Sequence, residues 1–457
     1  MRATIVTDLG YGDAGKGSVV DWLCRARGGA LVVRHNGGAQ AGHNVVTPDG
    51  RHHTFHQFGS GTLTGAHTHL SRFTLADPLE LAREADALTA LGVSDPWGLL
   101  TVDRDATVVS PHQKAAGRLR ELARGPTGHG TCGAGVGETV ADSLADVGLV
   151  LRVCDLACPA VVRRKLEVLR DLKRAQLADV LPVLRGVDRA APEIRTLEDP
   201  DLIPAVVDFY SWLSGCLRVV DSGWLGTAMR DAGHTVFEGA HGVLLDEWYG
   251  FHPHTTWSTC TTANARTLLA DAGFGGEVRS LGLLRAYATR HGPGPFPTED
   301  AGLSARLPDA HNGAGGWQGA FRVGWFDAVT ARYAVEVSGG VDELVVTCVD
   351  RLYGETDVRM CTAYGHGGVL AERLLVPSSP DLGFQESLTR VAFEARPFYG
   401  RVFPGVFGPG PVRDYCWTLG EVVGLPVGLV SLGPTAVDKF TPDDLPCDGR
   451  VWSASMT

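Results

Sequence analysis

The chain has 457 residues, more than the roughly 100–200 that one compact core usually holds, so we expect several lobes or one large domain with insertions. Hydrophobic residues make up 44% and charged residues 20% of it, which excludes a mainly disordered chain. The formal charge of −11 argues against binding to nucleic acid or a membrane through bulk electrostatics. A phosphate ligand would therefore need a local binding device.

The N-terminal segment reads as a strand, a glycine loop and a helix. Residues 2–8 are rich in β-branched types, 10–18 form a glycine-rich turn, and 19–25 have helical apolar spacing. A second buried strand is expected at 31–33 and a helix at 78–91. Asp8 interrupts any hydrophobic core of a signal peptide, so we expect a cytoplasmic protein.

Later segments continue the alternation of strands and helices. Residues 160–183 are amphipathic with a basic face that we interpret as solvated, and strands are expected at 235–238, 279–287 and 344–349. This order predicts an α/β fold with a large, mainly parallel central sheet flanked by helices and a P-loop-like start. We divide the chain into the first part of the α/β domain, a mainly helical insertion and the rest of the α/β domain: 1–116, 117–220 and 221–457.

The first glycine loop, 10–18, fits the pattern G-x-x-x-x-G-K, although Gly17 follows the lysine where Ser or Thr is usual. Glycines let backbone N–H groups approach phosphate oxygens, and the next helix presents its positive end. Lys16 could act as a point charge on a phosphate, and Asp13 is either a Mg²⁺ ligand or a base. The alternative is a plain connecting turn.

A second strand leads into another glycine loop, 34–43, which ends in His43. An imidazole in such a loop can act as a general acid near neutral pH. A structural or surface histidine remains the simpler alternative for this residue alone. The ten cysteines are scattered without a CxxC pair, so we expect ordinary reduced thiols.

Together these loops resemble the adenylosuccinate synthetases, whose patterns are W-G-D-E-G-K-G and G-G-H-N-A-G-H. Later segments agree with the family in the same order, from about residue 2 to 440. They are F-E-G-A-H-G at 237–242, A-Y-A-T-R-H-G-P-G-P-F-P-T-E at 286–299, R-V-G-W-F-D at 322–327, Asp350, and S-L-G-P at 431–434.

The resemblance implies a large α/β enzyme that uses GTP and Mg²⁺ and acts as a homodimer. GTP would phosphorylate the 6-oxygen of IMP, and the amine of aspartate would then displace phosphate. Asp13 would remove the proton from N1 of the purine ring, and it would bind Mg²⁺ together with the carbonyl of Gly42. His43 would stabilise the transferred phosphoryl group. The predicted GTP-binding residues are Gly12, Asp13, Gly15, Lys16, Gly17, Ser18, Gly42, His43, Asn44, Asp350, Ser431 and Gly433. The predicted acceptor-binding residues are Gln40, Thr127, His241, Thr256 and Arg322.

Several ligand positions depart from the family pattern. Ala14 replaces a Glu, Cys348 replaces the Lys of T-K-L-D, and His241 replaces a Gln that positions the oxo-purine, either as a hydrogen-bonding substitute or as another acid–base group. Asp142 stands where an Arg is expected on the acceptor's phosphate. The arginine-rich run that grips aspartate is reduced, within 312–322, to one Arg. A charge-assisted pair contributes about 1.5–3 kcal/mol, so aspartate and IMP are both in question as substrates.

Three hypotheses follow. The first is a GTP-dependent ligase that phosphorylates a carbonyl oxygen of an IMP-like oxo-heterocycle and admits an amine, aspartate or another, in specialised metabolism or as the ordinary purine enzyme. The second is a GTP-dependent kinase without the amine step. The third is a nucleotide-binding paralogue without turnover, and the retention of Asp13, Lys16 and His43 argues against it.

Overall fold

The computed structural model describes residues 1–28, 30–125, 128–309, 317 and 319–446. A ten-stranded sheet has the order β10-β7-β5-β2-β11-β1-β12-β16-β22-β23, and its neighbouring strands are parallel except for the antiparallel pair β22–β23. The strands are β1 Arg2–Asp8, β2 Leu31–Arg34, β5 His67–Leu70, β7 Leu100–Asp103, β10 Arg218–Val220, β11 His234–Glu238, β12 Glu277–Arg285, β16 Glu343–Thr347, β22 Val427–Ser431 and β23 Lys439–Phe440. The predicted mainly parallel α/β sheet is therefore confirmed.

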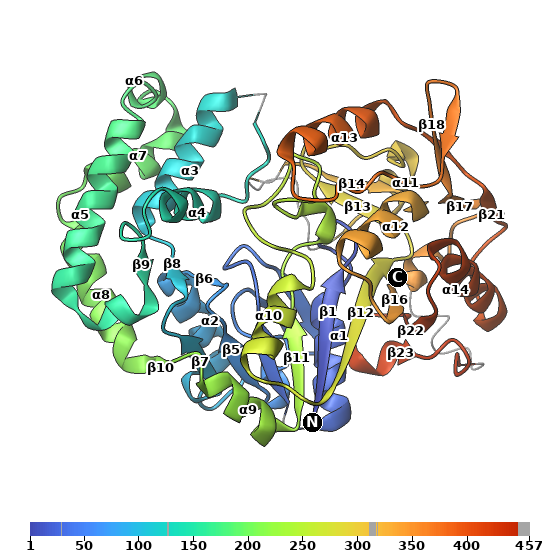
Figure 1. Cartoon of the computed structure of the whole chain (residues 1–457), viewed down its shortest axis with the longest axis horizontal. Helices are drawn as coiled ribbons and strands as arrows, with labels where there is room; N and C mark the ends of the chain where they lie inside the picture. Colours follow the sequence, from blue (N-terminus) through green and yellow to red (C-terminus); the bar gives the residue numbers. More distant parts are fainter. Residues whose placement is uncertain (29, 126–127, 310–316, 318, 447–457) are drawn as a thin grey trace.

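Helices cover the sheet and extend beyond it (Figure 1). They are α1 Lys16–Arg27, α2 Pro78–Ala90, α3 Pro111–Arg124, α4 Val136–Ala145, α5 Pro159–Gln176, α6 Leu181–Leu184, α7 Ala191–Glu198, α8 Leu202–Cys216, α9 Trp224–Ala232, α10 Ala263–Asp271, α11 Ala301–Arg306, α12 Ala328–Val337, α13 Leu382–Glu394 and α14 Pro409–Val423. In the part of the chain that the structure describes, no helix is both long and apolar enough to cross a bilayer.

Small sheets complete the fold. Their strands are β3 His43–Val46 with β4 His52–Phe55; β6 Leu75–Ala76 with β8 Thr107–Val108 and β9 Leu151–Arg152; β13 Ala288–His291 with β14 Phe321–Gly324; β15 Phe326–Asp327 with β17 Val358–Cys361 and β21 Arg401–Phe403; and β18 Ala363–His366 with β19 Val369–Ala371 and β20 Arg396–Phe398. The hairpin β3–β4 and the antiparallel pair β13–β14 carry candidate site residues.

The central strands are buried on both faces because successive side chains of a strand point in opposite directions. Val6 of β1 packs with Val19 and Val20 of α1 on one face. Ile5, its neighbour in β1, packs on the other face in a cluster that includes Leu268 of α10. A parallel strand covered on both sides explains the continuous apolar run that the sequence shows there.

Helices α3 to α8 gather on one side of the molecule, at the left of Figure 1, away from β16 and β22. The position of these helices agrees with the expected helical content of this stretch, while the boundaries at 116 and 220 stay a prediction. Lys173 of α5 is buried and forms ion pairs of 2.7 Å with Glu138 and Asp142 of α4. Helix α5 covers most of the amphipathic stretch 160–183 and ends at Gln176, and α6 begins at Leu181.

The predicted element ends needed small corrections. Helix α1 begins at Lys16 rather than at residue 19, because Gly15 adopts a left-handed conformation, φ 77°, and caps the helix there. Strand β12 covers Glu277–Arg285 instead of 279–287, and β16 ends at Thr347 instead of 349. The carboxyl ends of β1, β2, β11, β12 and β16 lie at the same edge of the sheet, where ligands of open parallel sheets bind.

Candidate active site

The first glycine loop leaves the end of β1 and turns back into α1. Gly12 and Gly15 have positive φ angles of 112° and 77°, which residues with a Cβ rarely adopt. Inside the loop, the buried ammonium of Lys16 lies 2.9 Å from Oδ2 of Asp8. The loop is thus closed around an ion pair of its own.

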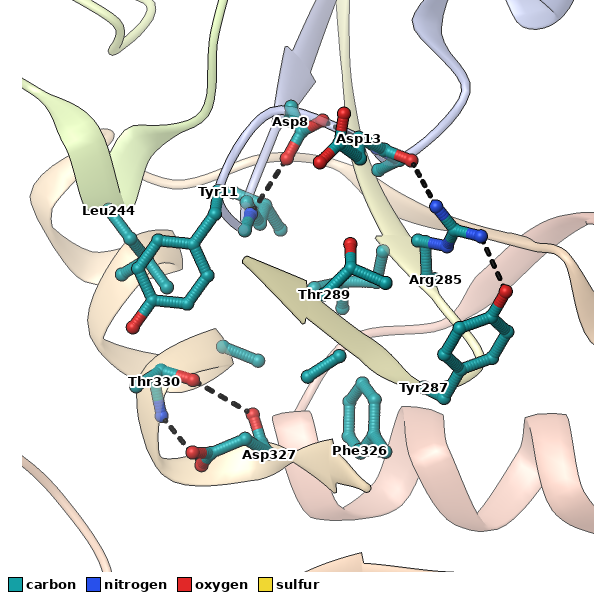
Figure 2. Close-up of a pocket in the computed structure, with 16 residues that line it drawn as sticks. Asp8, Tyr11, Asp13, Leu244, Arg285, Tyr287, Thr289, Phe326, Asp327 and Thr330 are labelled. Carbon is teal, nitrogen blue, oxygen red and sulfur yellow. Dashed lines mark hydrogen bonds between the residues drawn. The ribbon is translucent and has the colours of Figure 1, made fainter. Parts of the chain in front are cut away.

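Asp13 sits at the far side of this loop and borders a small cavity (Figure 2). Tyr11 lies on one side of this cavity, and Arg285 lies with Tyr287 on the other. Oδ2 of Asp13 is buried and accepts no hydrogen bond from the described residues, while Nε2 of His291 lies 3.9 Å from it. Burial raises the pKa of Asp13, against the lowering effects of His291 and Arg285, so its carboxylate is unusually ready to accept a proton.

His43 is the first residue of β3, and its Nδ1 lies 2.5 Å from Oε1 of Glu238, at the end of β11. Burial, and then the Arg34 guanidinium, lowers the pKa of His43 to about 4. Burial alone would raise the pKa of Glu238, but Arg34 and His43 outweigh it and lower that pKa to about 2. Both lowered pKa values agree with a neutral His43 imidazole that donates its Nδ1–H to the ionised carboxylate of Glu238.

His241 follows β11 and lies between the two glycine loops. Its φ of 60° is in the left-handed region, and a Cβ on Gly37 would come within 3.2 Å of its ring. Burial, followed by Lys16 and His43, lowers the pKa of His241 to about 3. The ring is therefore neutral at ordinary pH, and its buried Nδ1 has no hydrogen-bond partner among the described residues.

Gly17 allows α1 to approach the second loop closely. A Cβ at this position would lie 2.7 Å from the carbonyl oxygen of Asn44 and 2.9 Å from the carbonyl carbon of His43. Ser18, in the first turn of α1, donates its hydroxyl to the carbonyl of Gly15 at 3.1 Å. The structure thus brings together predicted GTP-binding residues from both loops.

The predicted guanine-binding residues lie after β16 and β22, next to the first loop. Thr347 connects the two regions, because its Oγ1 donates to the carbonyl of Ala14 at 3.0 Å. Burial raises the pKa of Asp350, and the hydroxyl of Ser431 donates to the carbonyl of Gly433 at 2.9 Å. Burial lowers the pKa of Lys439 to about 8, and Asp350 is among the carboxylates that oppose this effect.

The described residues that were predicted to bind the acceptor do not line the cavity beside Asp13; they are Gln40, His241, Thr256 and Arg322. Both polar side-chain atoms of Gln40 are buried and lack hydrogen-bond partners among the described residues. The backbone N–H of Thr256 donates to the carbonyl of Leu245 at 2.8 Å. Gly42 directly precedes β3, the first strand of the hairpin β3–β4. Thr127 lies outside the described residues.

Arg322 and Arg290 both have partners within the protein. Arg322 forms a 2.7 Å ion pair with Glu299 and donates to the carbonyl of Gly294 at 2.7 Å. Arg290 is buried, lies 4.2 Å above the ring of Tyr11 and donates to the carbonyl of Pro295. Neither guanidinium is an evident replacement for the missing arginine run.

Asp142 has partners of its own within the chain. It is buried in the helical lobe, where it accepts from Lys173 and, at 2.7 Å, from the side-chain amide of Gln113. The buried ammonium of Lys173 therefore compensates the charge of Asp142 within the chain.

Sequence reasoning missed four residues that shape this site: Asp8, Glu238, Arg285 and His291. Asp8 and Glu238 end buried strands directly before glycine-containing turns, a position at which parallel sheets place ligand-contacting groups. Arg285 ends β12 and donates to the carbonyl of Asp13 at 3.3 Å. His291 ends β13, directly before Gly292 in the segment 286–299 that the sequence had already singled out.

A family model for adenylosuccinate synthetase matches residues 5–439. The chain belongs to the adenylosuccinate synthetase family. Adenylosuccinate synthetases of Frankia alni and Saccharopolyspora erythraea are 33% and 31% identical to it over 97% and 95% of this chain, and 100% and 97% of theirs. The family predicted from the sequence is thereby confirmed.

Solved structures agree in fold. The fully ligated adenylosuccinate synthetase of Plasmodium falciparum matches with a TM-score of 0.75 at 20% identity, over 96% of this chain and 99% of that one. The succinoaminodeoxyadenylate synthetase of cyanophage S-2L, bound to dGMP and to dATP as an energy donor, matches with a TM-score of 0.58 at 18% identity, over 97% of each chain. Both likenesses extend the shared fold to nearly the whole chain.

Proposed function

We propose that the chain is a GTP- and Mg²⁺-dependent ligase that phosphorylates a carbonyl oxygen of an IMP-like oxo-heterocycle and then joins an amine to the activated carbon. One observation carries this proposal: the neutral His43, oriented by ionised Glu238, lies on a loop packed against the glycine loop that holds Asp13. Membership in the adenylosuccinate synthetase family supports the ligase class and the use of GTP.

In the first half-reaction, Asp13 takes the ring proton next to the carbonyl. The electron pair of the broken N–H bond forms an N=C bond in the ring, and the C=O π electrons move onto the exocyclic carbonyl oxygen, which attacks the γ-phosphorus as GDP leaves with the electrons of the broken P–O bond. Its raised pKa makes Asp13 a better base for a weakly acidic ring N–H than an exposed carboxylate would be. His43 can receive a proton on Nε2 and donate it to the transferred phosphoryl group, while Glu238 stabilises the imidazolium.

Magnesium fits the donors that this chain offers. Asp13 Oδ2 is a buried oxygen without a hydrogen-bond partner among the described residues, and the carbonyl of Gly42 is predicted to complete the protein ligands. No group of three His, Cys, Asp or Glu side chains suited to a metal occurs in the described ranges. One carboxylate supplemented by phosphate oxygens and waters is typical of Mg²⁺, which neutralises the charge that develops during phosphoryl transfer.

In the second half-reaction, the amine attacks the carbon that bears the phosphate, inorganic phosphate leaves with the C–O bond electrons, and the attacking nitrogen loses its extra proton to the solvent. A dicarboxylate donor needs cationic partners, but Arg322 and Arg290 are engaged within the protein. We therefore keep the donor open between aspartate and an amine with fewer carboxylates. Neutral His241 would face the heterocycle in place of the family's Gln and favour a different pattern of ring donors and acceptors.

The test is to incubate the protein with GTP, and in parallel ATP and dATP, with Mg²⁺ and a panel of oxo-heterocycles, with and without amino acids, and to measure GDP or ADP and phosphate. Phosphate that appears only when an amine is present supports the ligase. Acceptor-dependent GDP without free phosphate supports the kinase, and binding without GDP supports the paralogue. Asp13→Ala and His43→Ala should each abolish GDP formation while the fold survives. A cytoplasmic homodimer is part of the same proposal.

A further inference from the structure

The interior of the first glycine loop is occupied by the carboxylate of Asp8. Its Oδ1 accepts from the backbone N–H groups of Gly10 and Gly12 at 2.9 and 3.3 Å. Its Oδ2 accepts from the backbone N–H of Ala14 at 2.8 Å and from Nζ of Lys16 at 2.9 Å. Three peptide donors and one ammonium around one anion are what a phosphate would receive inside such a loop.

Lys16 is committed to this arrangement. Besides Asp8, its Nζ donates to the carbonyl of Gly12 at 2.6 Å. The Lys16 and Asp8 side chains are 1% and 0% exposed. Separating a buried ion pair leaves an uncompensated charge, which is strongly unfavourable, so a phosphate would have to displace an internal anion of the same sign.

The same contacts position Asp13. Gly12, the residue before Asp13, is held by both of its backbone polar groups: its N–H donates to Asp8, and its carbonyl accepts from Lys16. The peptide after Asp13 is held through the N–H of Ala14, which donates to Asp8. Asp13 therefore projects from a turn that the ion pair anchors on each side.

We propose that Asp8 is a built-in anion of the first glycine loop, and that Lys16 is a positioning residue that holds Asp8 and thereby places Asp13, rather than a ligand of the phosphates. The role of Asp13 in this inference rests on the proposed function, whereas the ion pair between Asp8 and Lys16 does not depend on that function. The triphosphate then stays outside the loop interior and meets the start of α1 and the loop 36–43.

The experiment compares Asp8→Asn, Lys16→Met and the double variant D8N/K16M. Lys165→Met, which removes an ion pair of 2.8 Å with Asp155 in the helical lobe, is the matched control. Two properties are measured: the affinity for GTPγS without metal by calorimetry, and the affinity for Mn²⁺ in the GTPγS complex by electron paramagnetic resonance. Thermal unfolding reports the ion pair separately.

If Lys16 is a positioning residue, K16M keeps GTPγS affinity within about threefold and weakens Mn²⁺ binding about tenfold or more, as Asp13→Asn does. The double variant should unfold at a higher temperature than either single variant, because it leaves no unpaired buried charge. The control should change neither affinity.

A Lys16 that binds phosphate gives the opposite pattern. K16M would then lose about tenfold or more in GTPγS affinity, the double variant would be no better, and D8N would bind more tightly. That result overturns the inference. Failure of the unaltered protein to bind GTPγS would instead contradict the proposed function, and the unfolding temperatures would still support or refute the ion pair.

Discussion

Glu238 accepts the Nδ1–H of His43 at 2.5 Å and receives, on its other oxygen, the backbone N–H of Ser60 at 2.9 Å. The carboxylate is therefore held in place by groups from two loops, and it selects the imidazole tautomer whose Nε2 is unprotonated. Such outer partners orient a catalytic histidine and stabilise its cationic form.

Glu238→Gln should lower the rate of GDP formation about 10–100-fold, because an amide can still accept a hydrogen bond but cannot stabilise the imidazolium. The matched control is Ser60→Ala, which removes a hydroxyl donor to Glu238 without changing its charge. This control should lose less than about tenfold. Equal rates for Glu238→Gln and the unaltered protein would contradict the role of the carboxylate.

Binding of GTP should be accompanied by proton uptake on His43. The pKa of about 4 keeps the empty ring neutral at pH 7, and a nearby phosphate charge raises an imidazole pKa by about 1–3 units. We expect up to about half a proton more for the unaltered protein than for His43→Asn at pH 7. Calorimetry in buffers of different ionisation enthalpy measures this difference, and identical uptake by both proteins would refute it.

Gly17→Ala should disturb nucleotide binding through packing alone. The new methyl group would lie 2.7 Å from the carbonyl oxygen of Asn44, so α1 or β3 must move at a cost of about 1–3 kcal/mol. The unfolding temperature and the affinity for GTPγS should both decrease. Gly186→Ala is the control, because nothing lies within 4 Å of its added Cβ, and it should leave both quantities unchanged.

Asp327 should make stability depend on pH. Burial raises its pKa from 3.8 to about 6, although Tyr364 and the first N–H groups of α12 oppose this effect. A raised carboxyl pKa favours the protonated folded state, so this contribution is complete below about pH 4 and is lost as the pH rises through about 6.

From pH 4 to 7 the free energy of unfolding of the unaltered protein should therefore fall by up to about 3 kcal/mol relative to Asp327→Asn. Asn preserves an acceptor for the capping N–H groups of Val329 and Thr330. Urea unfolding of both proteins at several pH values measures the difference. A constant difference across this range would show that Asp327 does not titrate there.

Much of the site was predictable because its residues follow strands directly in the sequence. A strand, a glycine loop and a helix with Asp13 inside place a ligand loop at the carboxyl edge of a parallel sheet, whatever the rest of the chain does. His43 could be placed on the second loop by the same reasoning. The family, confirmed over 5–439, followed from the order of these motifs.

By itself the sequence determined which segments are strands, which loops carry glycine, and which family the chain resembles, because these depend on neighbouring residues. Only the tertiary structure decided the partners of the charges. Lys16 pairs with Asp8, His43 with Glu238 and Asp142 with Lys173. All three pairs join residues from different elements. A buried charge takes its pKa and its role from the group packed against it, and packing between distant segments cannot be read from local spacing.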